Sequence, residues 1–109
     1  MKESESLPGI GQIVRIRKGR EAGNFAVVIG LVDDRFILVA DGEKRKSDRG
    51  KKKNKSHVEF LPHISEEVKR SLMETGRVTN AKLRYALIIY KTKHSTELLK
   101  EGEYMHGQR

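Results

Sequence analysis

Cysteine and tryptophan are absent from this chain of 109 residues. Without cysteine, disulfide bonds and thiolate metal sites are excluded, which fits a reducing compartment. Three Phe and three Tyr are the only aromatic residues. So few rings give little support to an aromatic cage for a methylated ligand, or to a broad stacking platform for single-stranded nucleic acid.

Long hydrophobic runs are also missing. The longest uninterrupted apolar run is Tyr85 to Tyr90, far shorter than the roughly 20 residues that cross a bilayer. The first six residues are acidic and polar, where a secretory signal would be basic and then apolar. We therefore expect a cytoplasmic protein with one compact domain and a flexible tail at residues 1–9.

Signals for catalysis are equally sparse. No glycine pair frames a Gly-Lys-Ser or Gly-Lys-Thr, no serine lies in a nucleophile-elbow pattern, and the pair Asp33-Asp34 reads as a turn. The histidines lack the short spacings that zinc sites use. We expect no enzyme activity, no metal and no cofactor, and solvated or core-edge roles for His57, His63, His94 and His106.

Positive charge is what the chain has in excess. Lys and Arg number 23 against 15 Asp and Glu, which gives a formal net charge of +8 and favours a polyanionic partner. Charge alone does not distinguish RNA, DNA and an anionic membrane surface. The segment from Asp41 to Ser56 holds eight basic and three acidic residues. Mutual repulsion predicts a hairpin tip or a long basic loop at 43–56, which would order on a phosphate backbone.

The stretch from Gly11 to Val39 contains three short runs of β-forming residues. In the first run, Val14 and Ile16 alternate with Arg15 and Arg17, the period of two for a strand with one face on a core and the other in water. We therefore expect both arginines to point outward.

Turn residues separate these runs. Gly19 to Gly23 forms a tight connection whose last glycine can take a positive φ. The next run, Phe25 to Val32, is apolar on both parities, so it is either covered on both faces or coiled through a small barrel. Asp33-Asp34 turns the chain into Arg35 to Ala40, and Asp41-Gly42 is a second hairpin signal.

The remaining elements are one strand and two helices. His57 to Leu61 reads as the last strand, which Pro62 ends. Ser65 followed by two glutamates begins a helix, and Gly76 ends it. Thr79 or Asn80 begins a second helix. One face of the first helix is expected at Val68, Leu72 and Met73, and one face of the second at Leu83, Ala86, Leu87 and Tyr90, with Tyr85 also packing.

Five blocks follow one another between Gly11 and Pro62, about half of the chain. They are Gly19-Arg20-Glu21-Ala22-Gly23, Val27-Val28, Phe36-Ile37-Leu38-Val39, the basic run after Gly42, and His57-Val58-Glu59-Phe60-Leu61-Pro62. In this order they resemble KOW-domain proteins, especially the KOW-domain large-subunit ribosomal proteins of archaea and eukaryotes and their short bacterial relatives. The resemblance implies a small SH3-like β-barrel that binds RNA, usually ribosomal RNA, without catalysis.

These patterns together predict a mainly β fold with an α extension: an SH3-like (KOW) barrel at 10–62, a helical extension at 63–94 and a polar, flexible tail at 95–109. The expected function is non-catalytic binding of large-subunit rRNA by a monomeric, ribosomal or ribosome-associated protein. The alternative is a protein-interaction module that uses the C-terminal helices and the barrel.

The predicted RNA contacts are basic or polar residues of the first strand, its turn and the basic loop, because Lys and Arg neutralise phosphates. Singly, each reads equally as an ordinary surface charge, and Phe25 reads as core more than as a stacking ring. The set is Arg15, Arg17, Lys18, Arg20, Asn24, Lys44, Arg45, Lys46, Arg49, Lys51, Lys52, Lys53, Lys55 and His57, with Gly19 and Gly23 shaping the turn.

Overall fold

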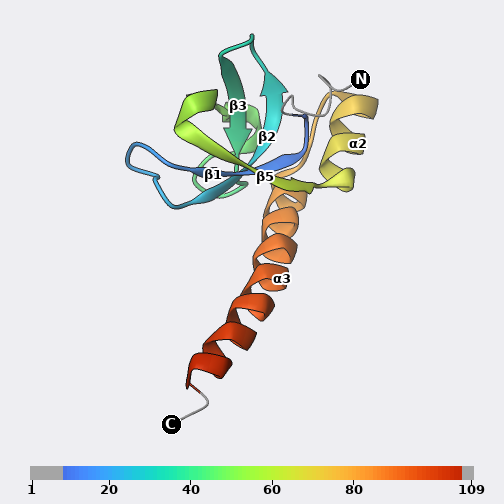
Figure 1. Cartoon of the computed structure of the whole chain (residues 1–109). Helices are drawn as coiled ribbons and strands as arrows, with labels where there is room; N and C mark the ends of the chain where they lie inside the picture. Colours follow the sequence, from blue (N-terminus) through green and yellow to red (C-terminus); the bar gives the residue numbers. More distant parts are fainter. Residues whose placement is uncertain (1–8, 107–109) are drawn as a thin grey trace, which may run out of the picture.

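A computed structural model describes the backbone of residues 9–106 and the side chains as far as His94. Five strands are followed by two helices (Figure 1). The strands are β1 (Gln12–Ile16), β2 (Phe25–Leu31), β3 (Phe36–Ala40), β4 (Lys51–Asn54) and β5 (Val58–Ile64), and the helices are α2 (Glu66–Thr75) and α3 (Asn80–His106). Short 3-10 turns at Ser47–Arg49 and Lys55–His57 flank β4.

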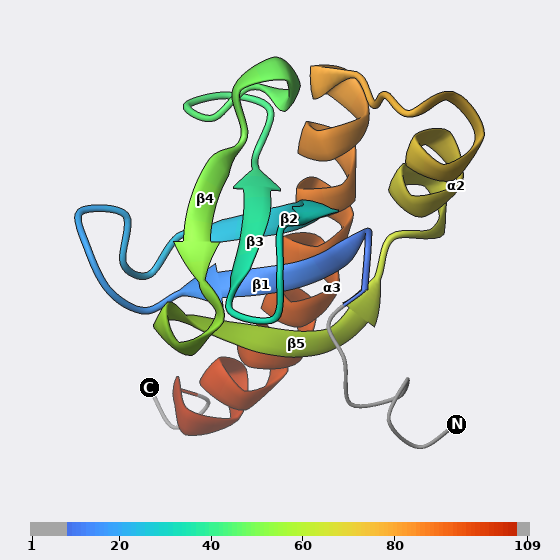
Figure 2. The same cartoon turned by 90° about the horizontal axis from the view of Figure 1, so that it is seen from above.

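The strands form one antiparallel sheet in the order β4-β3-β2-β1-β5. The sheet curls, so that β3 and β4 cross over β1, β2 and β5 on the side away from α3 (Figure 2). The turn Lys55–His57 joins β4 to β5, the two edges of the hydrogen-bonded order. A small curled sheet with a helical extension confirms the predicted mainly β fold.

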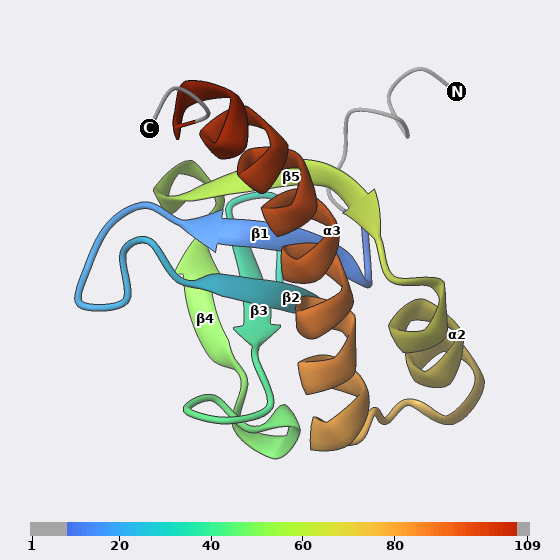
Figure 3. The same ribbon diagram turned by 90° about the horizontal axis from the view of Figure 1, so that it is seen from below.

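Two apolar clusters lie on opposite faces of the sheet. The inner cluster, within the curl, includes Val14, Val28 and Ile37. The outer cluster joins Ile13 and Val27 of the sheet to the helices. α3 lies across this outer face (Figure 3). Alternate residues of β2 serve the two clusters, which explains why this run is apolar on both parities and confirms that both of its faces are covered.

The predicted helix boundaries follow from their capping groups. Ser65 Oγ accepts a hydrogen bond from the Val68 N–H at 3.3 Å, and Gly76 ends α2 with φ 75°. Of the two candidates for starting α3, Thr79 caps the helix, because its Oγ1 accepts from the Lys82 N–H at 3.1 Å. The Asn80 side chain instead accepts from the Ser47 N–H at 2.7 Å.

The predicted buried face of α3 is confirmed at all four positions, Leu83, Ala86, Leu87 and Tyr90. Two other helical assignments are wrong. Met73 and Tyr85 are 71% and 57% exposed, so neither side chain packs against the core. The buried stripe of each helix is narrow, so a helical residue beside it stays largely exposed to solvent.

The prediction that 43–56 is one basic loop is wrong for its second half. Lys51–Asn54 is the edge strand β4, paired with β3 from Phe36↔Asn54 to Val39↔Lys51. A strand tolerates three successive lysines because neighbouring side chains point to opposite faces, and lysine on an edge also discourages pairing with other chains.

Pro62 does not end the last strand, which continues to Ile64. Among the described strands, β5 is at an edge of the sheet and pairs only with β1. Its register shifts between the pairs Val14↔Phe60 and Gln12↔Ile64, so Pro62 lies in the irregular stretch. An edge or a bulge is where a strand accommodates a residue without an N–H.

The ends of the helical extension also differ from the prediction. The helix α3 continues to His106, beyond the predicted end of the helical extension at residue 94. Residues 107–109 of the predicted C-terminal tail lie outside the described residues. So does the predicted N-terminal tail at 1–9, except for Gly9.

Candidate nucleic-acid interface

The loop between β1 and β2 is a tight structure built on two glycines. Gly19 and Gly23 have φ of 97° and 94°, values that favour residues without a Cβ. The Gly23 N–H donates to the Ile16 carbonyl at 2.6 Å, and the Ile16 N–H donates to the Asn24 carbonyl at 2.8 Å. The loop therefore holds the exposed residues Lys18 and Arg20 on a fixed backbone.

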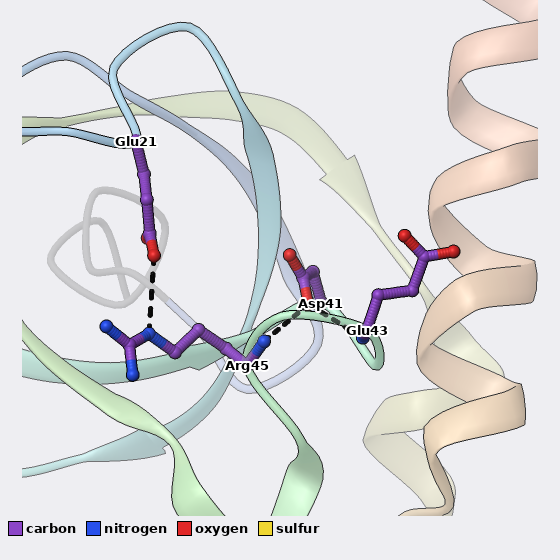
Figure 4. A network of polar contacts seen from close by, with 4 residues as sticks. All are labelled: Glu21, Asp41, Glu43 and Arg45. Carbon is purple, nitrogen blue, oxygen red and sulfur yellow. Dashed lines mark hydrogen bonds and ion pairs between the residues drawn. The ribbon is translucent and has the colours of Figure 1, made fainter.

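The turn after β3 is fixed by one carboxylate. Asp41 Oδ1 accepts hydrogen bonds from the N–H groups of Glu43 and Arg45 at 2.8 and 2.9 Å. The Glu21 carboxylate, from the β1–β2 loop, lies 3.3 Å from Arg45 Nε (Figure 4). This ion pair joins two loops that are separated by two strands in the sequence.

Alternation along β4 sends its lysines to both faces of the sheet. Lys51 and Lys53 pair with Val39 and Ile37, two residues of the inner cluster. The lysine between them, Lys52, lies on the other face, and its Nζ is 4.6 Å from the centroid of the Phe36 ring, a cation–π distance. The three lysines of β4 therefore lie on two different faces of the sheet.

One hollow, here called the basic pocket, gathers cations from three segments of the chain. Its cavity is about 340 Å³. Four of its side chains are cationic and one is a carboxylate, so the pocket is strongly positive. A Cβ on Gly19 would lie 3.5 Å from Lys53 Nζ, which shows how closely β4 approaches the loop. The lining residues are Gly19, Arg20, Glu21, Arg45, Lys51 and Lys53.

A second hollow holds two arginines, one in β1 and one directly after that strand. Arg15 and Arg17 line it together with Gly23 and Glu59. Arg15 is exposed and pairs in register with Phe25 on one side and Glu59 on the other. The outward direction predicted for both arginines is confirmed. Of the four basic residues around the first turn, Arg15 and Arg17 line this hollow, Arg20 lines the basic pocket and Lys18 lines neither.

A third hollow lies where α3 meets the loops. It is lined by Asn24, Phe25 and Lys44 from the sheet side and by Arg84 and Lys91 from the helix. Arg84 Nη1 donates to the Gly42 carbonyl at 2.9 Å, and Lys91 Nζ lies 5.8 Å from the Phe25 ring centroid.

The sequence by itself indicates Arg84 and Lys91 only as the polar side of an amphipathic helix. Their spacing of seven residues places both on one face of the helix. That spacing is a signal that a helix edge could join the basic surface.

Other predicted contact residues line none of these three hollows. Lys46 directly precedes the 3-10 turn Ser47–Arg49 and Arg49 is the last residue of that turn, and both side chains are exposed. Backbone hydrogen bonds fix the positions of Lys55 and His57, because the Lys55 N–H donates to the Arg35 carbonyl and the His57 carbonyl accepts from the Arg17 N–H. Lys18 and Lys52 are exposed outside the three hollows.

The turn between β2 and β3 carries a perturbed carboxylate. Asp33 Oδ1 accepts from the N–H groups of Arg35 and Phe36, both at 2.8 Å. These two bonds, with smaller contributions from the charges of Lys52 and Arg35, lower the pKa of Asp33 below its ordinary value. The predicted turn at Asp33-Asp34 is confirmed, and the carboxylate has a structural task.

The part of the chain that the structure describes has no group of three His, Asp or Glu side chains arranged to hold a metal ion. Within the same residues, no helix combines the length and hydropathy that a bilayer crossing requires.

Comparison with known proteins finds relatives connected with ribosomes. The chain is 41% identical over 71 residues to the "Putative ribosome-binding protein YbzG" of Bacillus subtilis, an alignment that covers 65% of this chain and 96% of the relative. It is 31% identical over 75 residues to the large ribosomal subunit protein eL14 of Hyperthermus butylicus, covering 62% of this chain and 76% of the relative. The eL14 of Aeropyrum pernix matches at the same identity and covers 75% of that relative. No family model matches the chain.

Proposed function

Because the chain belongs to the protein family that contains YbzG and the large ribosomal subunit protein eL14, we propose that it is a ribosome-associated RNA-binding protein. Its partner in this proposal is rRNA of the large subunit, its RNA-binding domain is of the KOW type, and its compartment is the cytoplasm. The relatives are named as ribosomal or ribosome-binding proteins and not as enzymes, which supports a role without catalysis.

The basic pocket is the observation that carries this proposal. Three segments that are distant in the sequence place four cationic side chains around one hollow. Lys and Arg around a concavity of this kind bind phosphates, releasing the counterions condensed on the nucleic acid. The pocket therefore supports contact with an RNA backbone.

In this mechanism a rigid backbone presents the basic residues, in place of the long basic loop that the sequence predicts at 43–56. The backbone of Arg45 is fixed by Asp41, and Lys51 and Lys53 belong to a paired strand. Binding to a preorganised surface costs less entropy than ordering a free loop. Because phosphate contacts carry little sequence information, the shape of the folded rRNA would determine where the protein binds.

Sedimentation of a cell extract through sucrose gradients tests the proposal. The protein should migrate with the large subunit at low salt, and it should move to the top of the gradient after ribonuclease treatment or at high salt. A large-subunit protein that is not released at the same salt serves as the control for subunit integrity. Sedimentation at the top of the gradient under every condition would contradict ribosome association.

The outer face of α3 favours a second candidate, contact with a protein. Tyr85, Ile88 and Ile89 are 57%, 58% and 40% exposed at neighbouring helical positions. Neighbouring exposed apolar side chains of this kind often mark a surface that contacts another protein. Under this candidate, Ile89→Ser would release a protein neighbour while leaving the affinity for isolated rRNA unchanged. Equal loss of both activities would refute it.

A further inference from the structure

We propose that Glu21 is a built-in competitor for RNA phosphate: its carboxylate occupies the basic pocket in the free protein, and a backbone phosphate displaces it from Arg45 on binding. This inference rests on the proposed RNA-binding function and adds a regulatory contact to the same site. It assigns a role to an acidic residue in the middle of a cationic surface.

The contact between Glu21 and Arg45 is close but incomplete. Glu21 Oε2 lies 3.3 Å from Arg45 Nε, within the range of an ion pair. The Arg45 Nε atom is buried, yet within the described residues its geometry gives it no hydrogen-bond partner. Proximity alone does not satisfy this group, because a charged N–H needs alignment with its acceptor as well. A buried donor without a well-aligned acceptor is costly, so a better acceptor would be favoured.

Phosphate is such an acceptor. The arginine guanidinium is a planar fork whose N–H groups match two oxygens of a phosphate. Four cations surround a single carboxylate in the pocket, and a phosphodiester carries the same single negative charge as Glu21. Exchanging one for the other keeps the local charge balance while it releases counterions from the RNA.

The exchange requires little more than a side-chain rotation. The backbone of Arg45 is held by Asp41 Oδ1, and the Glu21 carbonyl accepts from the Asn24 N–H at 2.9 Å. The Glu21 side chain is 21% exposed and the Arg45 side chain 38%, so both are within reach of a ligand. Side-chain rotation is common when a rigid surface binds its partner.

Two charge-matched variants separate the competitor role from a general effect of charge. Both Glu21→Gln and Glu43→Gln remove one negative charge from neighbouring turns, but only Glu21 contacts Arg45. A partly exposed ion pair of this kind contributes up to about 1 kcal/mol, so Glu21→Gln should bind transcribed large-subunit rRNA about two- to fivefold more tightly than Glu43→Gln does. Equal affinities for the two variants would overturn the proposal.

An Arg45→Met background tests whether Glu21 acts through Arg45. There, Glu21→Gln should have the same affinity as Glu43→Gln, since the competing contact is already gone. Thermal melting confirms that each variant is folded, and Glu21→Ala repeats the test if the glutamine variant is unstable. A twofold or larger advantage of Glu21→Gln that persists without Arg45 would also overturn the proposal.

Tripolyphosphate provides a probe that does not depend on RNA binding. Titration of the labelled protein should shift the NMR resonance of the Arg45 Nε–H group, at lower ligand concentration in Glu21→Gln than in Glu43→Gln. If this occurs and rRNA does not bind, the proposed function fails while the oligophosphate site stands. If rRNA binds and the Arg45 resonance does not respond to tripolyphosphate, the inference fails and the proposed function stands.

Discussion

Lys52 and Lys53 are neighbours in the sequence and carry the same charge, but they lie on opposite faces of β4. Lys53 lines the basic pocket, whereas Lys52 lies against the Phe36 ring on the other face. If RNA phosphates bind in the basic pocket, Lys53→Gln should weaken binding and Lys52→Gln should not. The pair therefore tests the position of the interface with no difference in net charge between the variants.

The magnitude follows from counterion release. Each phosphate contact on a duplex contributes about 0.9 to the slope of log affinity against log salt, so at about 0.1 M salt the loss of one contact weakens binding about eightfold. For a single-stranded target the slope per contact is about 0.7 and the loss about fivefold. Lys53→Gln should show this loss together with a shallower slope, while Lys52→Gln should keep the wild-type slope.

Filter binding or fluorescence anisotropy with transcribed rRNA, at a series of salt concentrations, measures both quantities. Thermal melting of each variant establishes that the sheet is intact, since both residues belong to a paired strand. Equal losses for the two variants would refute the assignment of the interface to the pocket face. A larger loss for Lys52→Gln would place the RNA on the opposite face.

Three further predictions concern stability and pH. Gly23→Ala should lower the free energy of unfolding by the roughly 1–2 kcal/mol that a left-handed backbone costs a residue with a Cβ, because Gly23 faces open space. Gly42→Ala should lower it by more, because its Cβ would also lie 2.5 Å from a backbone oxygen of α3. Denaturant unfolding of the two variants measures the difference. Leu83→Ala should cost about 2–5 kcal/mol by the same assay, and Tyr85→Ala, at an exposed position, within about 0.5 kcal/mol. The lowered pKa of Asp33 stabilises the fold above the unfolded-state value near 3.8, and that contribution is lost as pH falls through the folded-state pKa. NMR titration should find the pKa below 3.8, and a normal or raised value would contradict the role of the two backbone bonds.

The strand pattern is predictable because period-two burial is a local property of the sequence. Val14, Ile16 and the doubly apolar run of β2 indicate the correct faces from their spacing alone. Pro62 and the lysines of β4 mislead because the general preferences against them hold for central strands. Whether a strand lies at an edge depends on the order of the whole sheet, which is set by distant partners.

The candidate site is predictable in composition but not in arrangement. The basic residues are recognisable by type, yet their division among three hollows depends on strand register, which separates Lys52 from its neighbours. The contact between Glu21 and Arg45 joins residues of two different loops, and a single sequence carries no sign of it. Arg84 and Lys91 join the surface only because α3 crosses the outer face of the sheet.

A cryo-electron microscopy reconstruction of large ribosomal subunits with the protein bound tests the central claim most directly. The account predicts that the β1–β2 loop, the turn at Arg45 and β4 face rRNA, with a backbone phosphate in the basic pocket and the Glu21 side chain turned away from Arg45. A bound protein that contacts the subunit through other surfaces, with the basic pocket open to solvent, would contradict the account.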